Sequence, residues 1–587
     1  MLATLTRLLE LHASSQQPAK NRSSVDSHQS LKDRFSPNPQ GCATDEDEYI
    51  SFAGLVPQPV ILSLVDDFFR CSHNQPYSFF HEQSFRRRLS DGLIPNYLLF
   101  AVLATAVRFS SHPFFESQAH EAAITFANKS WKAIVSSCFA RDEKATIMTI
   151  QTITLLAIFD FTAGQSRHGS AWIKIGISVR IAQDLRLMMD SSTDFSYVDQ
   201  EERRRVFWSL YLLDRIVSCG RARPPAILEA SCQLQLPCGE KEWREGRQQV
   251  TDTLDQLSDK MFLQKESHGP FALVIIMAYI LSRAAQYMLQ EYNARSRYPP
   301  WDPNSDFASI CSDLLYIESS FDIGKPVEYL ISEELNDAAD IDYGSVNPMI
   351  FSRALFHLCH CLLNHPFLLR HRLDALDTRA PSSFLARAFD FGRGCAKRLT
   401  QLLSGAASSG PFIYAPFYGY CAVVAGSIQA LYLDSTNESI RLEAVDCVQE
   451  NLTILKKIGS FWINVSVMSE TLSSFYTDSP RFGILKSPEP QITPLSQPDQ
   501  EVMWSLVDYN TMSNAPKLRQ AYNPDLPHIM DTSLQQWLDL FGSQELELDT
   551  SAEVCDQMNL SRPMVFLDEP SNGSISFIQP HAEGRSS

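Results

Sequence analysis

The stretch EERRRVFWSLYLLDRIVSCGRARPPAI, from Glu201 to Ile227, has the clearest structural pattern in the sequence. Its apolar residues Val206, Leu210, Leu213 and Val217 recur at three- and four-residue spacing, which places them on one face of a helix. Two glutamates open the stretch, where the dipole of a helix favours negative charge. The sequence therefore predicts a helix with one apolar face, followed by an exit turn that begins at the glycine.

Charged residues inside this helix have more than one interpretation. Arg203, Arg204 and Arg205 are consecutive, as in a nuclear import signal or a phosphate-contact patch, or simply at the solvated start of a helix. We favour the solvated start, because the run is short and flanked by glutamates. Asp214 and Arg215 fall in the middle of the helix, and we expect them to pair with neighbouring helices or to point to solvent.

The same helical periodicity continues on both sides of this stretch and predicts an all-α protein. Strand-like alternation is almost absent. Of the 587 residues, 44% are apolar and 20% are charged, which is enough apolar surface for sizeable packed cores. Composition divides the chain into a disordered N-terminal segment (1–48), a first helical block (49–290), a linker (291–345), a second helical block (346–477) and an acidic, mostly disordered tail (478–587).

Neither a secretory signal nor a membrane-spanning segment is apparent, so we expect no membrane association. The longest apolar run, Phe271 to Leu281, is well short of the roughly 20 residues that cross a bilayer and predicts a buried helix. The 13 cysteines are an odd number, and several, such as Cys359, Cys421 and Cys447, lie in strongly apolar stretches. This is typical of reduced cysteines packed in the core of a nuclear or cytosolic protein.

Further stretches repeat the motifs of a known family in order. SAWIKIGISVRIAQDLRLM, from Ser170 to Met188, contains an Ala-Trp pair, a glycine, an Arg-Ile-Ala centre and an Asp-Leu end. FFHEQSF precedes it at Phe79 to Phe85, and LLNHPFLL follows at Leu362 to Leu369. Together with Glu201 to Ile227, these stretches resemble the fungal-specific transcription factor domain, the helical regulatory region of zinc-cluster activators. The resemblance covers roughly residues 60–462.

This resemblance implies an all-α regulatory domain that acts on RNA polymerase II genes in a fungal nucleus, with transcription machinery or coactivators as partners. It leaves open whether the chain forms homo- or heterodimers. Structural roles are implied for the residues that match the family motifs: Trp172, Gly176, Arg180, Trp208, Asp214, Arg215, Arg223 and Pro224. The alternative functions are a non-DNA-binding co-regulator or scaffold that partners a DNA-bound factor and, further removed, an α-helical enzyme without a recognisable motif.

The zinc cluster of this family needs six closely spaced cysteines, beginning with C-x2-C. The sequence contains no C-x2-C, and only Cys42 precedes the helical region. The formal net charge is −18, which disfavours contact of the whole surface with phosphate. We therefore expect no cofactor in this chain, and zinc only if a missing N-terminal cysteine cluster exists. Contact with DNA is expected only through a missing module or a partner.

Metal-binding and catalytic patterns are weak. His357, Cys361 and His365 recur at four-residue spacing, which can place two ligands on one metal, but a third ligand another turn away is harder to bring in. Core packing is the favoured interpretation of these residues. The signatures G-x-S-x-G, G-x-G-x-x-G, G-x4-G-K-[ST] and H-E-x-x-H do not occur. We expect neither a catalytic nor a metal site.

Bulky apolar residues in the tail are interspersed with acidic ones. Residues 486–587 contain 15 acidic and 5 basic side chains. The candidate activation motif is Trp537, Leu538, Asp539, Leu540 and Phe541. Acidic neighbours keep such apolar side chains solvated until the groove of a partner accepts them. The alternative is an amphipathic helix that docks on the core of the same chain. Residues 503–507 form a weaker second candidate.

Overall fold

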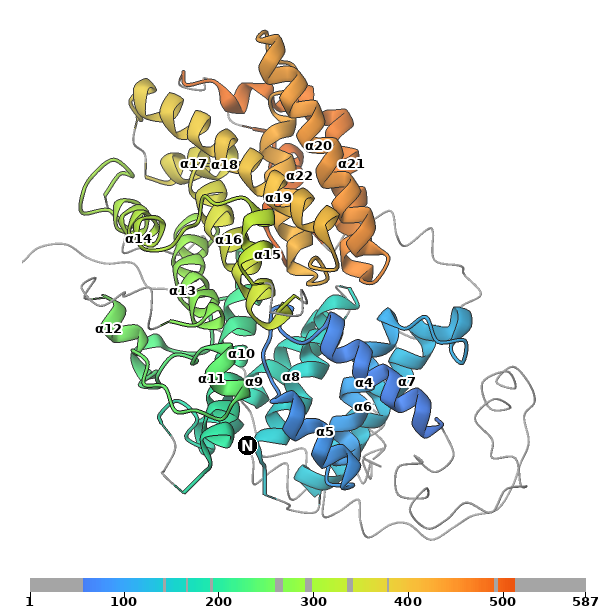
Figure 1. Ribbon diagram of the computed structural model, residues 1–587. Helices are drawn as coiled ribbons and strands as arrows, with labels where there is room; N and C mark the ends of the chain where they lie inside the picture. Colours follow the sequence, from blue (N-terminus) through green and yellow to red (C-terminus); the bar gives the residue numbers. More distant parts are fainter. Residues whose placement is uncertain are drawn as a thin grey trace, which may run out of the picture. The chain divides into compact units, whose positions relative to one another are not determined.

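Helices make up the regular secondary structure of the described part of the computed structural model (Figure 1). The structure describes residues 56–140, 144–164, 167–190, 194–258, 268–290, 298–334, 341–376, 379–489 and 495–512. In these ranges the only β-type pairing is one isolated bridge between Gln235 and Thr253. The prediction of an all-α fold is confirmed.

Among the described residues in the first half of the chain, the two longest helices are α10 (Tyr197–Val217) and α13 (Pro270–Met288), and the others are shorter. In order, the helices of this half are α4 (Gln58–Cys71), α5 (Glu82–Ser90), α6 (Asn96–Ala106), α7 (Ala119–Ile134), α8 (Ile147–Thr162), α9 (His168–Asp184), α10, α11 (Glu240–Arg244), α12 (Leu254–Ser258) and α13. The second half contributes α14 (Asp306–Ser320), α15 (Val327–Glu333), α16 (Tyr343–Leu363), α17 (Pro366–Ala375), α18 (Ser382–Ser409), α19 (Phe417–Ala430), α20 (Glu438–Gly459), α21 (Ile463–Asp478) and α22 (Gln497–Val507).

Helix α13 is a central element of the core. Pro270 lies at its first turn, where the missing N–H costs no hydrogen bond, and apolar residues cover almost its whole circumference. Its length and composition would allow it to cross a membrane, but 83% of its most apolar window is buried inside the protein. The helix packs along α16 and against α10 and α14, as a buried helix of the core does.

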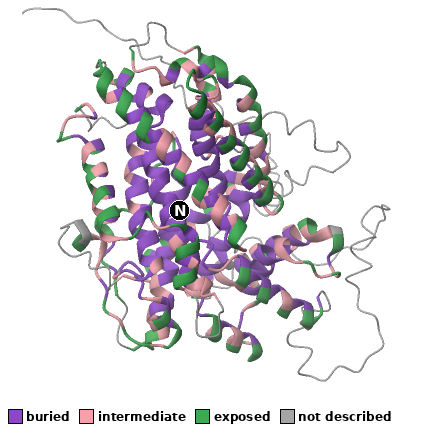
Figure 2. Cartoon of the chain, turned by 45° about the horizontal axis from the view of Figure 1, so that its top comes forward, coloured by how far each residue is buried: buried purple, intermediate pink, exposed green. Residues whose placement is uncertain are grey.

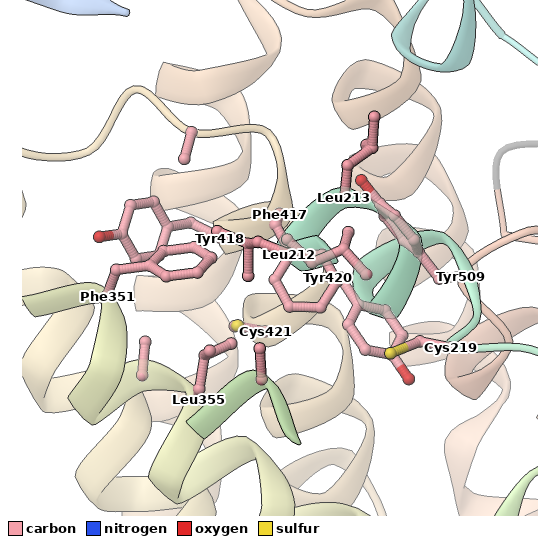
Figure 3. Close-up of a cluster of buried hydrophobic side chains, with 14 of the residues drawn as sticks. Leu212, Leu213, Cys219, Phe351, Leu355, Phe417, Tyr418, Tyr420, Cys421 and Tyr509 are labelled. Carbon is pink, nitrogen blue, oxygen red and sulfur yellow. The ribbon is translucent and has the colours of Figure 1, made fainter. Parts of the chain in front are cut away.

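The two helical blocks predicted from composition share a single hydrophobic core. Buried side chains from α10 and α13 of the first block belong to the same cluster as those from α16 and α19 of the second. Figure 2 shows buried residues running continuously through the packed helices, with exposed residues on the outer faces. Figure 3 shows side chains from both blocks meeting, among them Leu212, Phe351 and Tyr418. The division into blocks therefore describes the sequence and not the packing.

The stretch predicted as a linker, residues 291–345, contains two packed helices, so this prediction was wrong for most of its described part. Helix α14 is capped by Ser305, whose side chain accepts a hydrogen bond from the Ala308 backbone N–H at 3.1 Å. It buries Ile310, Leu314 and Ile317, which are spaced three or four residues apart. Helix α15 follows and packs on α18. The polar composition of this stretch reflects only the exposed faces of these helices.

The boundary of the tail also differs from the prediction. The packed structure continues beyond residue 477 through a 3-10 segment, Ser479–Lys486, and through α22. Helix α22 buries the residues of the weaker activation candidate: Met503, Trp504, Leu506 and Val507. The Trp504 ring lies 5.2 Å from the rings of both Phe367 and His371. Residues 503–507 are therefore part of the core, and the chain stays packed as far as Met512.

Candidate functional site

The family-motif residues of α10 centre on a helix that is buried on nearly all sides. The Ser196 side chain caps its first turn by accepting a hydrogen bond from the Asp199 backbone N–H at 3.2 Å. Trp208 is fully buried, and its Nε1–H donates to the Gln235 backbone carbonyl at 2.8 Å. Burial extends around the whole helix from residue 205 to residue 217, so the prediction of a single apolar face was too narrow.

Buried charge pairs hold the N-terminal end of α10. The Arg205 guanidinium is completely buried and binds Glu201 at 2.9 Å and Glu240 at 2.5 Å. It also donates to the Cys238 backbone carbonyl at 2.8 Å and to the Ser78 hydroxyl at 3.0 Å. Burial lowers the pKa of Arg205, but Glu240 and Glu201 raise it by more, so the side chain remains a cation. We name Arg205 with its two glutamates the N-terminal charge cluster.

The arginine run therefore does not form the solvated helix start that we favoured. Arg205 is buried in the core, and Arg204 pairs with Glu201 at 2.5 Å and with Asp190 at 3.1 Å. Arg203 covers the Phe195 ring at 4.8 Å. Because its charges are used within the protein, the run offers no continuous basic patch for phosphate or for an import receptor.

Asp214 and Arg215 hold the loop that leaves α10. The Asp214 carboxylate accepts hydrogen bonds from the backbone N–H groups of Ala226 at 2.9 Å and Ile227 at 3.0 Å. Arg215 donates to the Ile227 carbonyl at 2.6 Å, and its guanidinium lies 4.2 Å from the centre of the Tyr211 ring. Both residues are buried, so they do not point to solvent; Arg215 also pairs at 3.7 Å with Glu229 of the neighbouring 3-10 helix, Glu229–Ser231, in line with the other alternative that we expected.

The glycine of the exit turn contacts residues 508–512, which we call the C-terminal strap. A Cβ atom on Gly220 would overlap with the Asn510 Nδ2 and lie 2.6 Å from the Asp508 Oδ1. The strap donates from the Tyr509 backbone N–H to the Cys219 carbonyl at 2.9 Å. With any other residue at this position, the side chains of Asn510 and Asp508 would have to move.

Side chains of the strap add to these backbone contacts. The Arg221 backbone N–H donates to Asp508 at 3.2 Å. Tyr509 is buried, with its ring 5.1 Å from the rings of Phe161, Phe417 and Tyr420. Figure 3 shows Tyr509 beside Cys219 and Tyr420. The strap therefore joins the exit of α10 to α8 and α19 at the point where the chain continues into the acidic tail.

The remaining family-motif residues lie on the outer side of α9 and on the exit loop. The Arg223 guanidinium covers the half-buried Trp172 ring at 5.0 Å, which ties the loop to α9. Pro224, Gly176 and Arg180 are exposed. Arg180 donates to Gln183 at 2.9 Å, and a Cβ on Gly176 would meet no atom within 4 Å. These last three residues make no close contact that explains their place in the motif.

The histidines and the cysteine considered as metal ligands pack in the core. His365 accepts a hydrogen bond from the Phe367 backbone N–H at 3.3 Å and contacts the Ser427 hydroxyl at 3.1 Å. Burial lowers the pKa of His365 and of His357 to about 3, so both are neutral. Among the residues that the structure describes, no cluster of three metal-ligand side chains is found. The cysteines in the same ranges are free thiols.

The candidate activation motif, Trp537 to Phe541, lies outside the described residues.

A family model described as the fungal specific transcription factor domain matches residues 65–328, which include the N-terminal charge cluster and the exit of α10. The chain contains a fungal specific transcription factor domain. This domain defines a family of transcription factors, not of enzymes. The resemblance predicted from the motif stretches is thereby confirmed.

Curated relatives agree with this assignment. The Zn(2)-C6 fungal-type transcription factor FTF1c of Fusarium oxysporum f. sp. lycopersici is 28% identical over 440 residues, which cover 70% of this chain and 45% of that protein. The Zn(2)-C6 fungal-type transcription factor FTF2 of the same organism is 25% identical and covers 71% and 39%. An uncharacterized transcriptional regulatory protein of Schizosaccharomyces pombe is 23% identical and covers 84% and 56%.

The chain thus spans less than half the length of these two Fusarium relatives. No solved structure matches the chain.

Proposed function

We propose that the chain is a nuclear regulator of RNA polymerase II genes whose helical domain carries an acidic tail that contacts coactivators. The family supports a role in transcription regulation. The observation that carries the proposal is the C-terminal strap, because it anchors the start of the tail to the exit of α10. A tail held there has a defined starting point on the regulatory domain.

Contact with DNA is assigned to a separate module. The formal net charge of −18 disfavours broad contact with phosphate, and the six closely spaced cysteines of a zinc cluster do not occur in this sequence. We propose that a zinc-cluster module, on this polypeptide or on a DNA-bound partner, supplies the zinc and the base contacts.

The tail is proposed to act through Trp537, Leu538 and Phe541. Coactivator grooves accept short amphipathic helices by burying a few bulky anchors, each of which can contribute on the order of 2 kcal/mol. Ordering the tail offsets part of this gain, so the expected affinity is modest. Asp539 and the acidic residues that follow it keep the anchors solvated before binding.

A tethering experiment tests this role. Residues 513–587 are fused to an unrelated DNA-binding domain upstream of a reporter gene, and we expect activation. Replacing Trp537, Leu538 and Phe541 with Ala should remove most of the signal. A matched control replaces 565–567, Val-Phe-Leu in the same tail, with Ala and should keep most of it. A silent wild-type tail, or equal losses in the two triple variants, would refute the assignment.

The second candidate is a co-regulator that never binds DNA itself. It is favoured by the absence of C-x2-C from the sequence and by the acidic charge. Metal analysis and mobility-shift assays on the polypeptide as isolated from its own cells distinguish the two. Two zinc ions per chain with sequence-specific binding near physiological salt would exclude the co-regulator, whereas binding that disappears with added salt is generic attraction to phosphate.

A further inference from the structure

A cavity of about 430 Å³ lies between α4, the loop before α5, α11 and the first turn of α16. Its size is within the range of sites for small molecules. Helices α4, α5 and α11 belong to the first sequence block, and the lining residues at the start of α16 come about one hundred positions after α11, so the cavity is where segments far apart in the sequence meet. It is not part of the α10 exit, although Glu240 connects its wall to the N-terminal charge cluster.

Four side chains in the wall of the cavity have a buried polar atom without a hydrogen-bond partner among the described residues: Asn74, Trp243, and the ring nitrogens Nδ1 of His73 and Nε2 of His81. Asn74 and Trp243 are each only 4% exposed. Within the described part of the chain, no group bonds to the Asn74 Oδ1, which is an acceptor, or to the Trp243 Nε1–H, which is a donor. Buried polar groups are nearly always hydrogen-bonded, so an unpaired acceptor and an unpaired donor that line one cavity point to a ligand.

Both side chains are held in place by their surroundings. The Trp243 ring lies between the Arg205 guanidinium, 4.0 Å from its centre, and the His81 ring at 5.5 Å. The loop that carries Asn74 is fixed by the next residue, because the Gln75 side chain donates to the Phe412 carbonyl at 2.9 Å. A rearrangement that pairs Asn74 or Trp243 internally would disrupt these contacts.

The charged side chains in the wall of the cavity are all engaged in ion pairs. Arg244 binds Asp342 at 2.9 Å, and Arg86 binds Asp66 at 2.7 Å and Glu82 at 2.8 Å. His73, another wall residue, is neutral because burial and the nearby Arg205 lower its pKa to about 3. Arg70 and Glu240 are likewise paired, with Asp67 and Arg205, so each charged side chain of the wall has an ion partner and none is free to select an ionic ligand.

Aromatic rings form much of the remaining wall: Phe69, Phe80, Trp243 and Tyr343. Rings of this kind favour flat ligands, against which they stack or pack edge to face. The shape, the paired charges and the unpaired atoms of Asn74 and Trp243 thus restrict the ligand independently of one another.

We propose that this cavity binds an uncharged, planar heterocycle with a hydrogen-bond donor for the Asn74 Oδ1 and an acceptor for the Trp243 Nε1–H. A cyclic amide fused to an aromatic ring has this combination. The proposed site does not depend on the activity proposed for the tail. Ligand binding to it is measured without a reporter gene, so the two proposals can fail separately.

Isothermal titration calorimetry of the full chain with quinazolin-4(3H)-one tests the site. This uncharged bicyclic amide carries one N–H donor and one carbonyl acceptor. We expect one molecule to bind per chain. 3-Methylquinazolin-4-one, which lacks the donor, should bind roughly tenfold more weakly, as expected for one lost hydrogen bond. Quinoline-2-carboxylate, a flat anion of similar size, should bind no better than the methylated compound.

Protein variants locate the binding. Trp243→Phe keeps an aromatic ring and removes the N–H, and Asn74→Gly removes the amide while tolerating the backbone φ of 57° at this position. Each should weaken the binding of quinazolin-4(3H)-one roughly tenfold. Trp301→Phe, the same change outside the cavity, should leave it unchanged.

Three results would overturn the site. These are no binding of quinazolin-4(3H)-one up to its solubility, tighter binding of the carboxylate, and equal affinity for the two quinazolinones. If Asn74→Gly does not fold, the comparison of the two quinazolinones on the unaltered chain still decides the matter.

Discussion

The two ends of helix α10 both bury charge, but they use it differently. At the N-terminal end, Arg205 is surrounded by the carboxylates of Glu201 and Glu240, so charge is balanced by charge. At the C-terminal end, Asp214 and Arg215 bind mainly the backbone of the loop at residues 226–227. The first arrangement fixes side chains in the core, whereas the second fixes the path of the chain. We therefore expect mutations at the N-terminal end to affect global stability and those at the C-terminal end to act more locally.

The largest effect is expected for Arg205→Met. It leaves the buried Glu240 without its cation and Glu201 with Arg204 alone, which should lower the free energy of unfolding by about 3–5 kcal/mol. Urea denaturation of the full chain measures the loss. Arg203→Met is the matched control, and because Arg203 forms no ion pair with a described residue, it should cost less than about 1 kcal/mol. Equal losses in the two variants would remove the distinction between the two ends.

Asp214→Ala should cost about 2 kcal/mol, since the N–H groups of Ala226 and Ile227 lose their acceptor. Asp214→Asn retains one acceptor oxygen and should cost about half as much. Hydrogen exchange provides the local measurement, because the amides of Ala226 and Ile227 should exchange faster while those of α13 remain protected. Uniformly faster exchange would show that this end also supports the whole core.

The free energy contributed near the C-terminal end of α10 should also depend on pH. His168 stacks on Phe161 at 4.4 Å, and burial together with Arg223 lowers its pKa to about 4. Between about pH 6.5 and 4 the unfolded chain binds the proton more readily, so this stabilising contribution is present above pH 6.5 and is lost as the pH falls.

The expected loss between pH 6.5 and 5 is on the order of 1 kcal/mol. His357, His360 and His365 titrate in the same direction, so the comparison is with His168→Gln under identical conditions. The variant should show a shallower decline of unfolding free energy with acid. A parallel decline would mean that His168 is already protonated in the folded protein.

The smallest global effect is expected for Gly220→Ala. The new methyl group would displace Asn510 and Asp508, whose side chains can move, so the loss should stay below about 1 kcal/mol. The C-terminal strap, however, should become accessible, and limited proteolysis followed by mass spectrometry should detect faster cleavage near residues 508–512. Gly176→Ala, where a Cβ meets no atom within 4 Å, is the control and should not change cleavage. Unchanged cleavage in Gly220→Ala would argue against the strap contact.

Much of the helical architecture could be predicted from the periodicity of apolar residues, because a helix that packs against others on one face has an apolar residue at every third or fourth position. The exit of α10 could be located for the same reason. The role of Arg205 could not be predicted, since it depends on Glu240 and Cys238, more than thirty residues away in the sequence. Flanking glutamates usually indicate a solvated helix start, but Glu201 is the internal partner of Arg205.

The error in the tail has a different cause. An amphipathic helix with acidic residues has the same composition whether it binds a partner or its own core. Met503 and Trp504 dock on the core because a site formed by Phe367, His371 and Arg221 exists in the same chain. No local sequence pattern around residue 504 predicts that site, because the residues that form it are far away in the sequence. The unpaired atoms of Asn74 and Trp243 were missed for a similar reason, as only the fold brings them to one cavity.

The depth of α13 in the core has a consequence for how the protein is made. Its main packing partner, α16, is encoded more than fifty residues later. At the usual pace of translation, α13 leaves the ribosome several seconds before α16 is complete, about 4–15 s by typical synthesis rates. During that interval the nineteen-residue helix lacks its main packing partner and can be covered only in part, by α10 and α14. We therefore expect the nascent chain to need shielding of this surface at this stage, and we expect its yield in the cell to depend on the synthesis rate as well as on the stability of the finished fold.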